Sequence, residues 1–370
     1  MVKGRVKEVF PGGNTSQGFF SFYDYIIPTD ATRIMIIKGG PGVGKSSFMK
    51  AIAEDMNEQG FDVELHHCSS DNNSIDGVVF PQLNVAMIDG TSPHVVDPKN
   101  PGAVDEIIHL GDYWNEQGMR QNKTQVMELN TEVGRSFRRA YQYVKAAKVI
   151  HDDLETIYGE GLDYGVGNQE AANLIKTIFA DKPIAEKVGK LRKLFASAIT
   201  PEGFQNFLPS IFENISNIYL VTGVAGSGKS TLINKLASAA IERGFDCEGY
   251  YCAFDPLKIE HLLIEELGVG IITSVFPHKY ELKVGETIDM NVGLAGYIET
   301  KYNKIIEDDL RYEKDLLNLG ISYIQQAKKL HDEMEQYYIP NMDFEAISEL
   351  REKTLKRIIG YAEEKMVLIN

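Results

Sequence analysis

Short apolar runs alternate with segments of helical periodicity along most of the chain. Near the N-terminus, Arg33 to Lys38 has the pattern of a buried strand, and Ser46 to Glu58 has the spacing of a helix. Asp62 to His67 and Leu83 to Ile88 predict two further strands. Strands that alternate with helices are typical of α/β folds, so we expect a parallel sheet flanked by helices.

Two longer segments also have helical periodicity, from about Glu116 to Tyr158 and from about Glu299 to Tyr338. The apolar stripe of the second one predicts a face packed against the sheet or the other copy, with a coiled-coil arm to a partner as the alternative. Before the first segment, Thr91 to Gly111 is rich in Pro, Gly and Asp. We expect a loop-dominated insertion there, either a substrate or lid segment or an inert surface loop.

The chain contains an internal duplication. Lys45 recurs as Lys229, 184 positions later, and the same offset joins several other pairs: Gly60-Phe61-Asp62 with Gly244-Phe245-Asp246, Cys68 with Cys252, Asp71 with Asp255, and Pro93-His94 with Pro277-His278. Further along, His151-Asp152 returns as His331-Asp332 at an offset of 180. A repeat of this length is a domain rather than a solenoid unit. The sequence therefore predicts two tandem domains, copy one at 1–185 and copy two at 186–370.

Each copy contains a glycine-rich segment that fits GxxxxGK[ST], follows an apolar run and precedes a helical segment. Glycines let successive N–H groups turn inward around an anionic phosphate, and the helix N-terminus adds its positive dipole end. We expect two phosphate-binding loops of the kind found in P-loop NTPases. Their residues are Gly39, Gly40, Pro41, Gly42, Val43, Gly44, Lys45, Ser46 and Ser47 in copy one, and Gly223, Val224, Ala225, Gly226, Ser227, Gly228, Lys229, Ser230 and Thr231 in copy two.

The two copies differ where a metal-binding carboxylate is expected. Lys45 would contact the β and γ phosphates, and Ser46 would hold Mg²⁺ opposite Asp89, which ends the Walker B-like run 85–89. In copy two, Ser230 is the corresponding metal ligand, but the aligned strand ends at Thr273. We therefore predict catalysis mainly in copy one. Copy two would bind nucleotide in a supporting role, unless Asp255, Glu265 or Glu266 replaces the missing acid.

Other polar residues near the predicted strand ends are candidates for chemistry. Asp71 is a candidate catalytic base if the reaction is phosphoryl transfer to a hydroxyl group, and a turn-initiating Asp is the alternative. His94 and His278 would contact a phosphate or pack within a loop. The segment from His66 to Asp71 contains four residues of metal-ligating types, namely His66, His67, Cys68 and Asp71. A transition-metal site is disfavoured there, because adjacent histidines on a strand point to opposite faces and no second cluster completes a site.

The overall charge and cysteine content restrict the class of protein. A net charge of −15 argues against general binding to nucleic acids or anionic membranes. Three cysteines without a CxxC pair indicate reduced thiols, and the N-terminal residues lack the apolar region of a signal peptide. The sequence therefore predicts a cytoplasmic protein without a membrane-spanning segment.

Four kinds of segment carry a family resemblance: Phe10-Pro11-Gly12-Gly13-Asn14-Thr15, the two glycine-rich loops, Ile88-Asp89-Gly90-Thr91-Ser92-Pro93-His94, and Leu110-Gly111-Asp112-Tyr113-Trp114. With them the chain resembles a bacterial family of tandem P-loop proteins described as ATPases or nucleotide-kinase-like ATP-binding proteins. The resemblance spans most of the chain and implies ATP as the ligand. It identifies neither an acceptor nor a protein partner.

Three functions fit these observations. The first is a Mg²⁺-dependent ATPase, and the second is a small-molecule or nucleotide kinase that uses Asp71 as its base. The third is a nucleotide-gated interaction module, in which ATP sets the domain arrangement and the long helices contact a partner. A GTPase is disfavoured, because Asn122-Lys123-Thr124-Gln125 lacks the base-reading carboxylate of NKxD.

Overall fold

The computed structural model describes residues 2–275 and 285–369, which form two compact units. Unit 1 comprises Met1–Gly12, Ser21–Arg138 and Tyr323–Asn370, and unit 2 comprises Gly13–Phe20 and Arg139–Ser322. Each unit thus combines segments from both halves of the sequence. The predicted boundary between residues 185 and 186 separates the two copies of the sequence repeat. The two compact units divide the chain at other positions.

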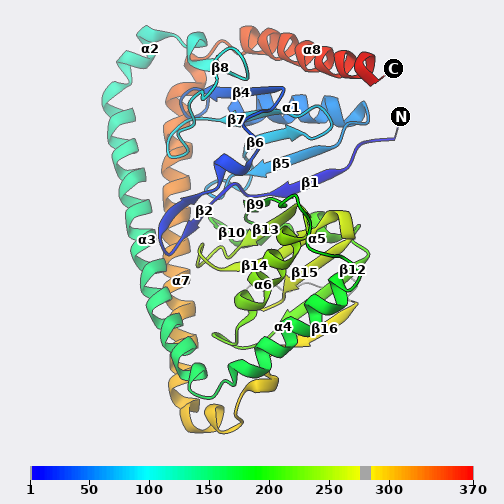
Figure 1. Cartoon of the computed structure of the whole chain (residues 1–370). Coiled ribbons are helices and arrows are strands. Elements are labelled where there is room, and N and C mark those ends of the chain that lie inside the picture. Colours follow the sequence, from blue (N-terminus) through cyan, green and yellow to red (C-terminus); the bar gives the residue numbers. More distant parts are fainter. Residues whose placement is uncertain (1, 276–284, 370) are drawn as a thin grey trace. The chain divides into compact units, whose positions relative to one another are not determined.

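Unit 1 is built on a six-stranded sheet (Figure 1). Its strands, in spatial order, are β1 (Val6–Val9), β5 (Val63–His67), β6 (Ile75–Phe80), β7 (Val85–Asp89), β4 (Arg33–Lys38) and β8 (Asp105–His109). β4 runs parallel to both of its neighbours, β7 and β8. Its four central residues are buried, as expected for a strand covered on both faces.

The sheet is mixed, which corrects the prediction of a purely parallel one. β6 is antiparallel to both β5 and β7. The connections on either side of β6 are only residues 68–74 and 81–84. A parallel neighbour needs a crossover of about a dozen residues or more, so these short connections allow only antiparallel pairing.

Helices from both ends of the chain complete unit 1. α1 (Lys45–Glu58) covers the sheet and α8 (Phe344–Ile369) packs against α1, so that Ile347 and Ile358 join the buried core around Met35 and Phe48. The remaining helical elements of this unit are η1 (Tyr23–Tyr25), η2 (Leu110–Tyr113), α2 (Glu116–Gln121), the first part of α3 (Lys123–Gly159), the last part of α7 (Tyr297–Tyr338) and η5 (Ile339–Asn341).

Unit 2 repeats the same sheet order with the second set of strands (Figure 1). They are β9 (Leu191–Leu194), β13 (Cys247–Tyr251), β14 (Ile259–Ile264), β15 (Val269–Thr273), β12 (Asn217–Thr222) and β16 (Glu286–Asp289), and β14 is again antiparallel to its neighbours. The hairpins β2 (Gly12–Thr15) with β3 (Gly18–Ser21) and β10 (Ser197–Thr200) with β11 (Gly203–Asn206) also belong here, apart from the two outer residues of the first hairpin.

The helices of unit 2 are α4 (Tyr164–Phe179), α5 (Leu208–Phe212), α6 (Lys229–Glu242), η3 (Glu265–Leu267), η4 (Met290–Gly293), the last part of α3 and the first part of α7. Within this unit α3 and α7 run antiparallel. Two contacts show this direction. A Cβ atom on Gly320 of α7 would come within 2.7 Å of the Val144 side chain of α3, and seven residues further along α3, His151 Nδ1 lies 3.2 Å from Oε2 of Glu313, which is seven residues earlier in α7. None of the helices in residues 2–275 and 285–369 is long and apolar enough to cross a bilayer.

The three strands predicted in copy one correspond to β4, β5 and β7, and the helix Ser46 to Glu58 corresponds to α1. Glu299 to Tyr338 corresponds to α7, whereas Glu116 to Tyr158 is divided into α2 and α3. The region Thr91 to Gly111 is not only loop, because it contains the edge strand β8. β6 was also missed, since its sequence Ile-Asp-Gly-Val-Val-Phe is buried at every position and does not alternate.

The core contribution of α8 gives a first prediction. Ile358 is 0% exposed, so Ile358→Ala should lower the free energy of unfolding of unit 1 by about 2–5 kcal/mol through lost burial and a residual cavity. Trp114, the single tryptophan, lies in unit 1 and reports its unfolding in urea by fluorescence. Ile107 on β8 is 51% exposed, so the matched control Ile107→Ala should lower the free energy of unfolding by less than about 1 kcal/mol. Equal effects would contradict a core role for α8.

Candidate phosphate-binding loops and the charged helix faces that cover them

The first glycine-rich segment, residues 39–46 (loop one), connects the end of β4 to the start of α1. Gly42 and Gly44 have φ angles of +64° and +89°, where a side chain would be strained, and Gly44 directly precedes the first helical residue, Lys45. Lys45 Nζ donates to the carbonyl oxygens of Gly39 at 3.0 Å and Gly40 at 2.8 Å. The ammonium group is therefore held over the loop, next to the helix N-terminus.

Asp89 lies beside this lysine at the carboxyl end of β7. Its Oδ2 is 3.6 Å from Lys45 Nζ, and both side chains are largely shielded from solvent. β7 pairs with β4 so that Asp89 is opposite Ile37, close to the point where loop one leaves the sheet. The hydroxyl of Ser46 accepts a hydrogen bond from the N–H of Ile75 at 3.0 Å. The predicted catalytic lysine and carboxylate are thus brought together by the register of two parallel strands.

The second glycine-rich segment, residues 223–230 (loop two), has nearly the same backbone. Gly226 and Gly228 have φ angles of +73° and +91°, and Lys229 Nζ donates to the carbonyl oxygens of Gly223 at 2.9 Å and Val224 at 2.6 Å. Burial lowers the pKa of Lys229 to about 8. This lysine is thus partly deprotonated at mildly alkaline pH unless an anion binds beside it.

Thr273 stands where Asp89 stands in the other copy. It is 2% exposed, and its hydroxyl has no hydrogen-bond partner among the described residues. It lines a cavity of about 320 Å³ beside loop two, together with Lys229, Ser230, Cys252, Glu260 and the α3 residues His151 and Glu155. The cavity is therefore bounded by the loop on one side and by a helix on the other.

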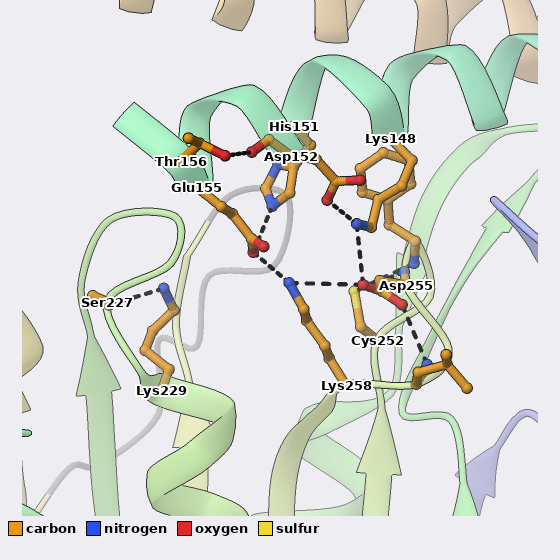
Figure 2. A network of polar contacts seen from close by, with 12 residues as sticks. Lys148, His151, Asp152, Glu155, Thr156, Ser227, Lys229, Cys252, Asp255 and Lys258 are labelled. Atoms are coloured by element: carbon orange, nitrogen blue, oxygen red, sulfur yellow. Dashed lines mark hydrogen bonds and ion pairs between the residues drawn. The ribbon is translucent and has the colours of Figure 1, made fainter. Parts of the chain in front are cut away.

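A chain of alternating charges runs along this helix face (Figure 2). Lys148 from α3 contacts Asp152 and lies 3.3 Å from Asp255, and Asp255 lies 3.7 Å from Lys258. Lys258 also contacts Glu155. Figure 2 shows these α3 side chains pointing toward the segment that follows β13. Every charged group in this network has an opposite charge beside it, which offsets the free-energy cost of removing these groups partly from water.

His151 continues the chain and carries a positive charge at neutral pH. Burial alone would lower its pKa, but contacts with Glu155 at 3.5 Å and Glu313 at 3.2 Å raise that pKa to about 9. Burial would raise the pKa of Glu155, yet His151 and Lys258 lower it to about 2. Protonated His151 therefore stabilises unit 2 below its ordinary pKa of about 6.5, and this contribution is lost as the pH rises through about 9.

Loop one faces an equivalent helix segment within unit 1. Lys328 of α7 contacts Asp332 and lies 3.6 Å from Asp71, and His331 lies 3.5 Å from Glu335. The N–H of Gly42 donates to Glu335 Oε1 at 3.2 Å. A carboxylate thus uses one of the loop N–H groups that a bound phosphate would need.

The structure distributes the remaining predicted residues in different ways. Asp71 accepts hydrogen bonds from the N–H of Asn73 and the hydroxyl of Ser74, so it stabilises a turn as well as pairing with Lys328. Its role as a base stays a prediction. Thr231 lines a separate open hollow along α6 rather than the cavity beside loop two, and Ser47 lies in the first turn of α1. His278 lies outside the described residues.

Several site residues were not identified from the sequence. Glu335 and Glu155 belong to helices far from the loops in sequence, although the 180-residue offset pairs them. Asp76 and Glu260 lie in the strands β6 and β14, at the 184-residue offset. Searching the repeat for shared acidic positions would have found both pairs.

Comparisons of the chain with protein-family models, with curated proteins and with solved structures find no match. The resemblance to tandem P-loop proteins remains a prediction from the motifs.

The charged chain at α3 gives a second prediction. In Glu155→Gln one of the two carboxylates around His151 becomes neutral, so the pKa of His151 should fall from about 9 by one unit or more. An NMR titration of the histidine ring protons measures this pKa, with His151→Gln used to assign the signal. The control Glu242→Gln removes a carboxylate at the opposite end of α6 from loop two and should leave the pKa unchanged. A His151 signal that titrates near 6.5 in the unmodified protein would contradict the network.

Proposed function

We propose that this protein is an ATP-binding, Mg²⁺-dependent P-loop NTPase, which hydrolyses or transfers the γ-phosphate mainly at loop one. The observation that carries the proposal is the distance of 3.6 Å between Lys45 Nζ and Asp89 Oδ2, at the sheet edge where loop one leads into α1. A helix N-terminus, a lysine and a carboxylate placed together are the parts that phosphoryl-transfer sites use to bind a triphosphate and its metal.

Each residue has a defined task in this proposal. The N–H groups of loop one and the ammonium of Lys45 would bind the phosphates, and the hard oxygen donors of Ser46 and Asp89 suit Mg²⁺. The metal would neutralise charge on the phosphate oxygens. Asp71 is the proposed base if the γ-phosphate passes to an acceptor hydroxyl rather than to water.

Loop two has the supporting role in this proposal. It keeps the glycine geometry and the buried Lys229, and an anion bound beside this lysine would stabilise its ammonium form and raise its pKa again. It has Thr273 instead of an acid at the strand end. The cytoplasm is the proposed compartment, because the sequence has only three cysteines and no CxxC pair.

This asymmetry gives a third prediction. Asp89→Asn should lower the rate of ATP turnover at saturating Mg²⁺ about 100-fold or more, because it removes a charge from the metal site, whereas Lys229→Ala should retain turnover within about threefold. Phosphate release measures hydrolysis, and candidate hydroxyl acceptors are added to detect transfer, which Asp71→Asn should abolish. Equal losses in Asp89→Asn and Lys229→Ala would disprove the assignment of catalysis to loop one.

A second candidate function is a nucleotide-gated interaction module, and the contact between Gly42 and Glu335 favours it. A phosphate in loop one would compete with the Glu335 carboxylate for the Gly42 N–H group. Nucleotide binding would therefore displace the α7 segment that carries Glu335. Such a displacement converts occupancy of the loop into a change at a long helix, which is what a switch requires.

Competition at Gly42 gives a fourth prediction. Glu335→Gln should bind ATP about tenfold more tightly at loop one, because a competing charged acceptor is replaced by a weaker neutral one. Calorimetry in a Lys229→Ala background isolates loop one, and Glu333→Gln, at an exposed position on the same helix, is the matched control. Hydrogen exchange of residues 323–338 should also increase with ATP. Identical affinities in the two glutamine variants would show that Glu335 does not compete with the phosphate.

A further inference from the structure

Beside loop one, a buried cluster combines three different metal-ligating side chains. Cys68 directly follows β5, Asp76 is in β6, and His94 is in the loop after β7. One ligand atom from each lies within 4.8 Å of the other two, and His94 Nε2 is 3.7 Å from Asp76 Oδ2. Cys68 is 8% exposed and Asp76 5% exposed. Three sequence-distant residues therefore converge on one small, shielded volume.

We propose that Cys68, Asp76 and His94 bind a Zn²⁺ ion. A sulfur, an imidazole nitrogen and a carboxylate oxygen form the mixed donor set that suits this borderline-soft cation better than Mg²⁺ or Ca²⁺. Tetrahedral zinc holds its nitrogen and oxygen ligands about 3.3–3.5 Å apart, given bond lengths of about 2.0–2.2 Å. The observed 3.7 Å separation needs only a small adjustment.

Contacts around the cluster already orient these ligands. The Tyr23 hydroxyl donates to Asp76 Oδ2 at 2.7 Å, and the Tyr23 ring stacks on the His94 ring with centroids 4.9 Å apart. Metal-binding side chains are usually held by such outer contacts, which fix ring and carboxylate orientation. Three protein ligands leave a fourth position for water or substrate, as in catalytic zinc sites. Tyr23 is therefore an orienting residue of this site.

The duplication supplies independent support. Cys252, Glu260 and His278 follow Cys68, Asp76 and His94, respectively, at the same offset of 184 positions. His278 lies outside the described residues. Cys252 and Glu260 both line the cavity beside loop two. The N–H groups of Phe254 and Asp255 donate to Cys252 Sγ at 3.4 and 3.3 Å, whereas burial and the nearby Glu260 raise the pKa of this thiol well above its ordinary value. Both copies thus keep a Cys, an acid and a His, although the acid changes from Asp to Glu.

The ion would lie close to the proposed reaction centre. β6 and β7 are antiparallel with Gly77 opposite Ile88, so Asp76 comes next to Asp89 at the end of the same ladder. A second dication there would add positive charge near the triphosphate site. Binding of the ion itself requires no nucleotide, so this proposal stands or fails separately from the proposed function.

A cobalt titration of the full chain tests the site. In a Cys252→Ser background, metal-free protein should bind one equivalent of Co²⁺ and show a thiolate-to-cobalt charge-transfer band, with Zn²⁺ displacing the Co²⁺. Adding Cys68→Ser should abolish the band. Asp76→Asn and His94→Gln should each weaken Zn²⁺ binding at least about tenfold, since even outer contacts contribute this much.

Two further observations make the result decisive. Cys247→Ser, which removes a buried cysteine outside the cluster, should leave both the band and the Zn²⁺ affinity unchanged. Trp114 fluorescence checks that unit 1, which holds the cluster, is folded in each variant. The proposal is overturned if the folded protein gives no thiolate band, or if the band survives in Cys68→Ser.

Discussion

The positive potential of the two glycine-rich loops determines what packs against them. Inward N–H groups, a helix N-terminus and a lysine are concentrated at each loop, and in each unit a helix supplies the compensating acid. At loop one, the Glu335 carboxylate accepts a hydrogen bond from the N–H of Gly42. At loop two, Gly226 lies against the α3 backbone, and a Cβ atom on this glycine would come within 2.9 Å of the Glu155 carbonyl oxygen. The same potential would attract a phosphate. The Glu335 carboxylate and the proposed nucleotide would therefore compete for the same N–H group at loop one.

The two copies use this arrangement differently. Near loop two, His151 lies between two carboxylates and is protonated at neutral pH. Near loop one, burial lowers the pKa of the matching His331, and the Lys328 ammonium adds to that effect. Together with the exchange of Asp89 for Thr273, this difference shows how a duplicated fold acquires unequal sites through a few charged positions. The proposed division of labour between loops follows that inequality.

The local features of the fold were predictable because they depend on neighbouring residues. The run Arg33 to Lys38 was recognised as a buried strand and has the bounds of β4. The helix predicted from Ser46 to Glu58 corresponds to α1, which begins one residue earlier, at Lys45, and the helical segment expected after loop two is α6. β6 and β8 were missed. β6 has no alternation because both faces are covered, and β8 is short and follows a segment rich in Pro and Gly.

The sequence by itself determined the duplication, the two loops and the difference between Asp89 and Thr273, because these are encoded in residue identity and spacing. Only the tertiary structure decided which distant side chains meet. It placed the Glu335 carboxylate where it accepts the N–H of Gly42, and it brought Cys68, Asp76 and His94 into one cluster. Strand register and helix packing determine these contacts. Both depend on burial summed over the whole core rather than on any local sequence pattern.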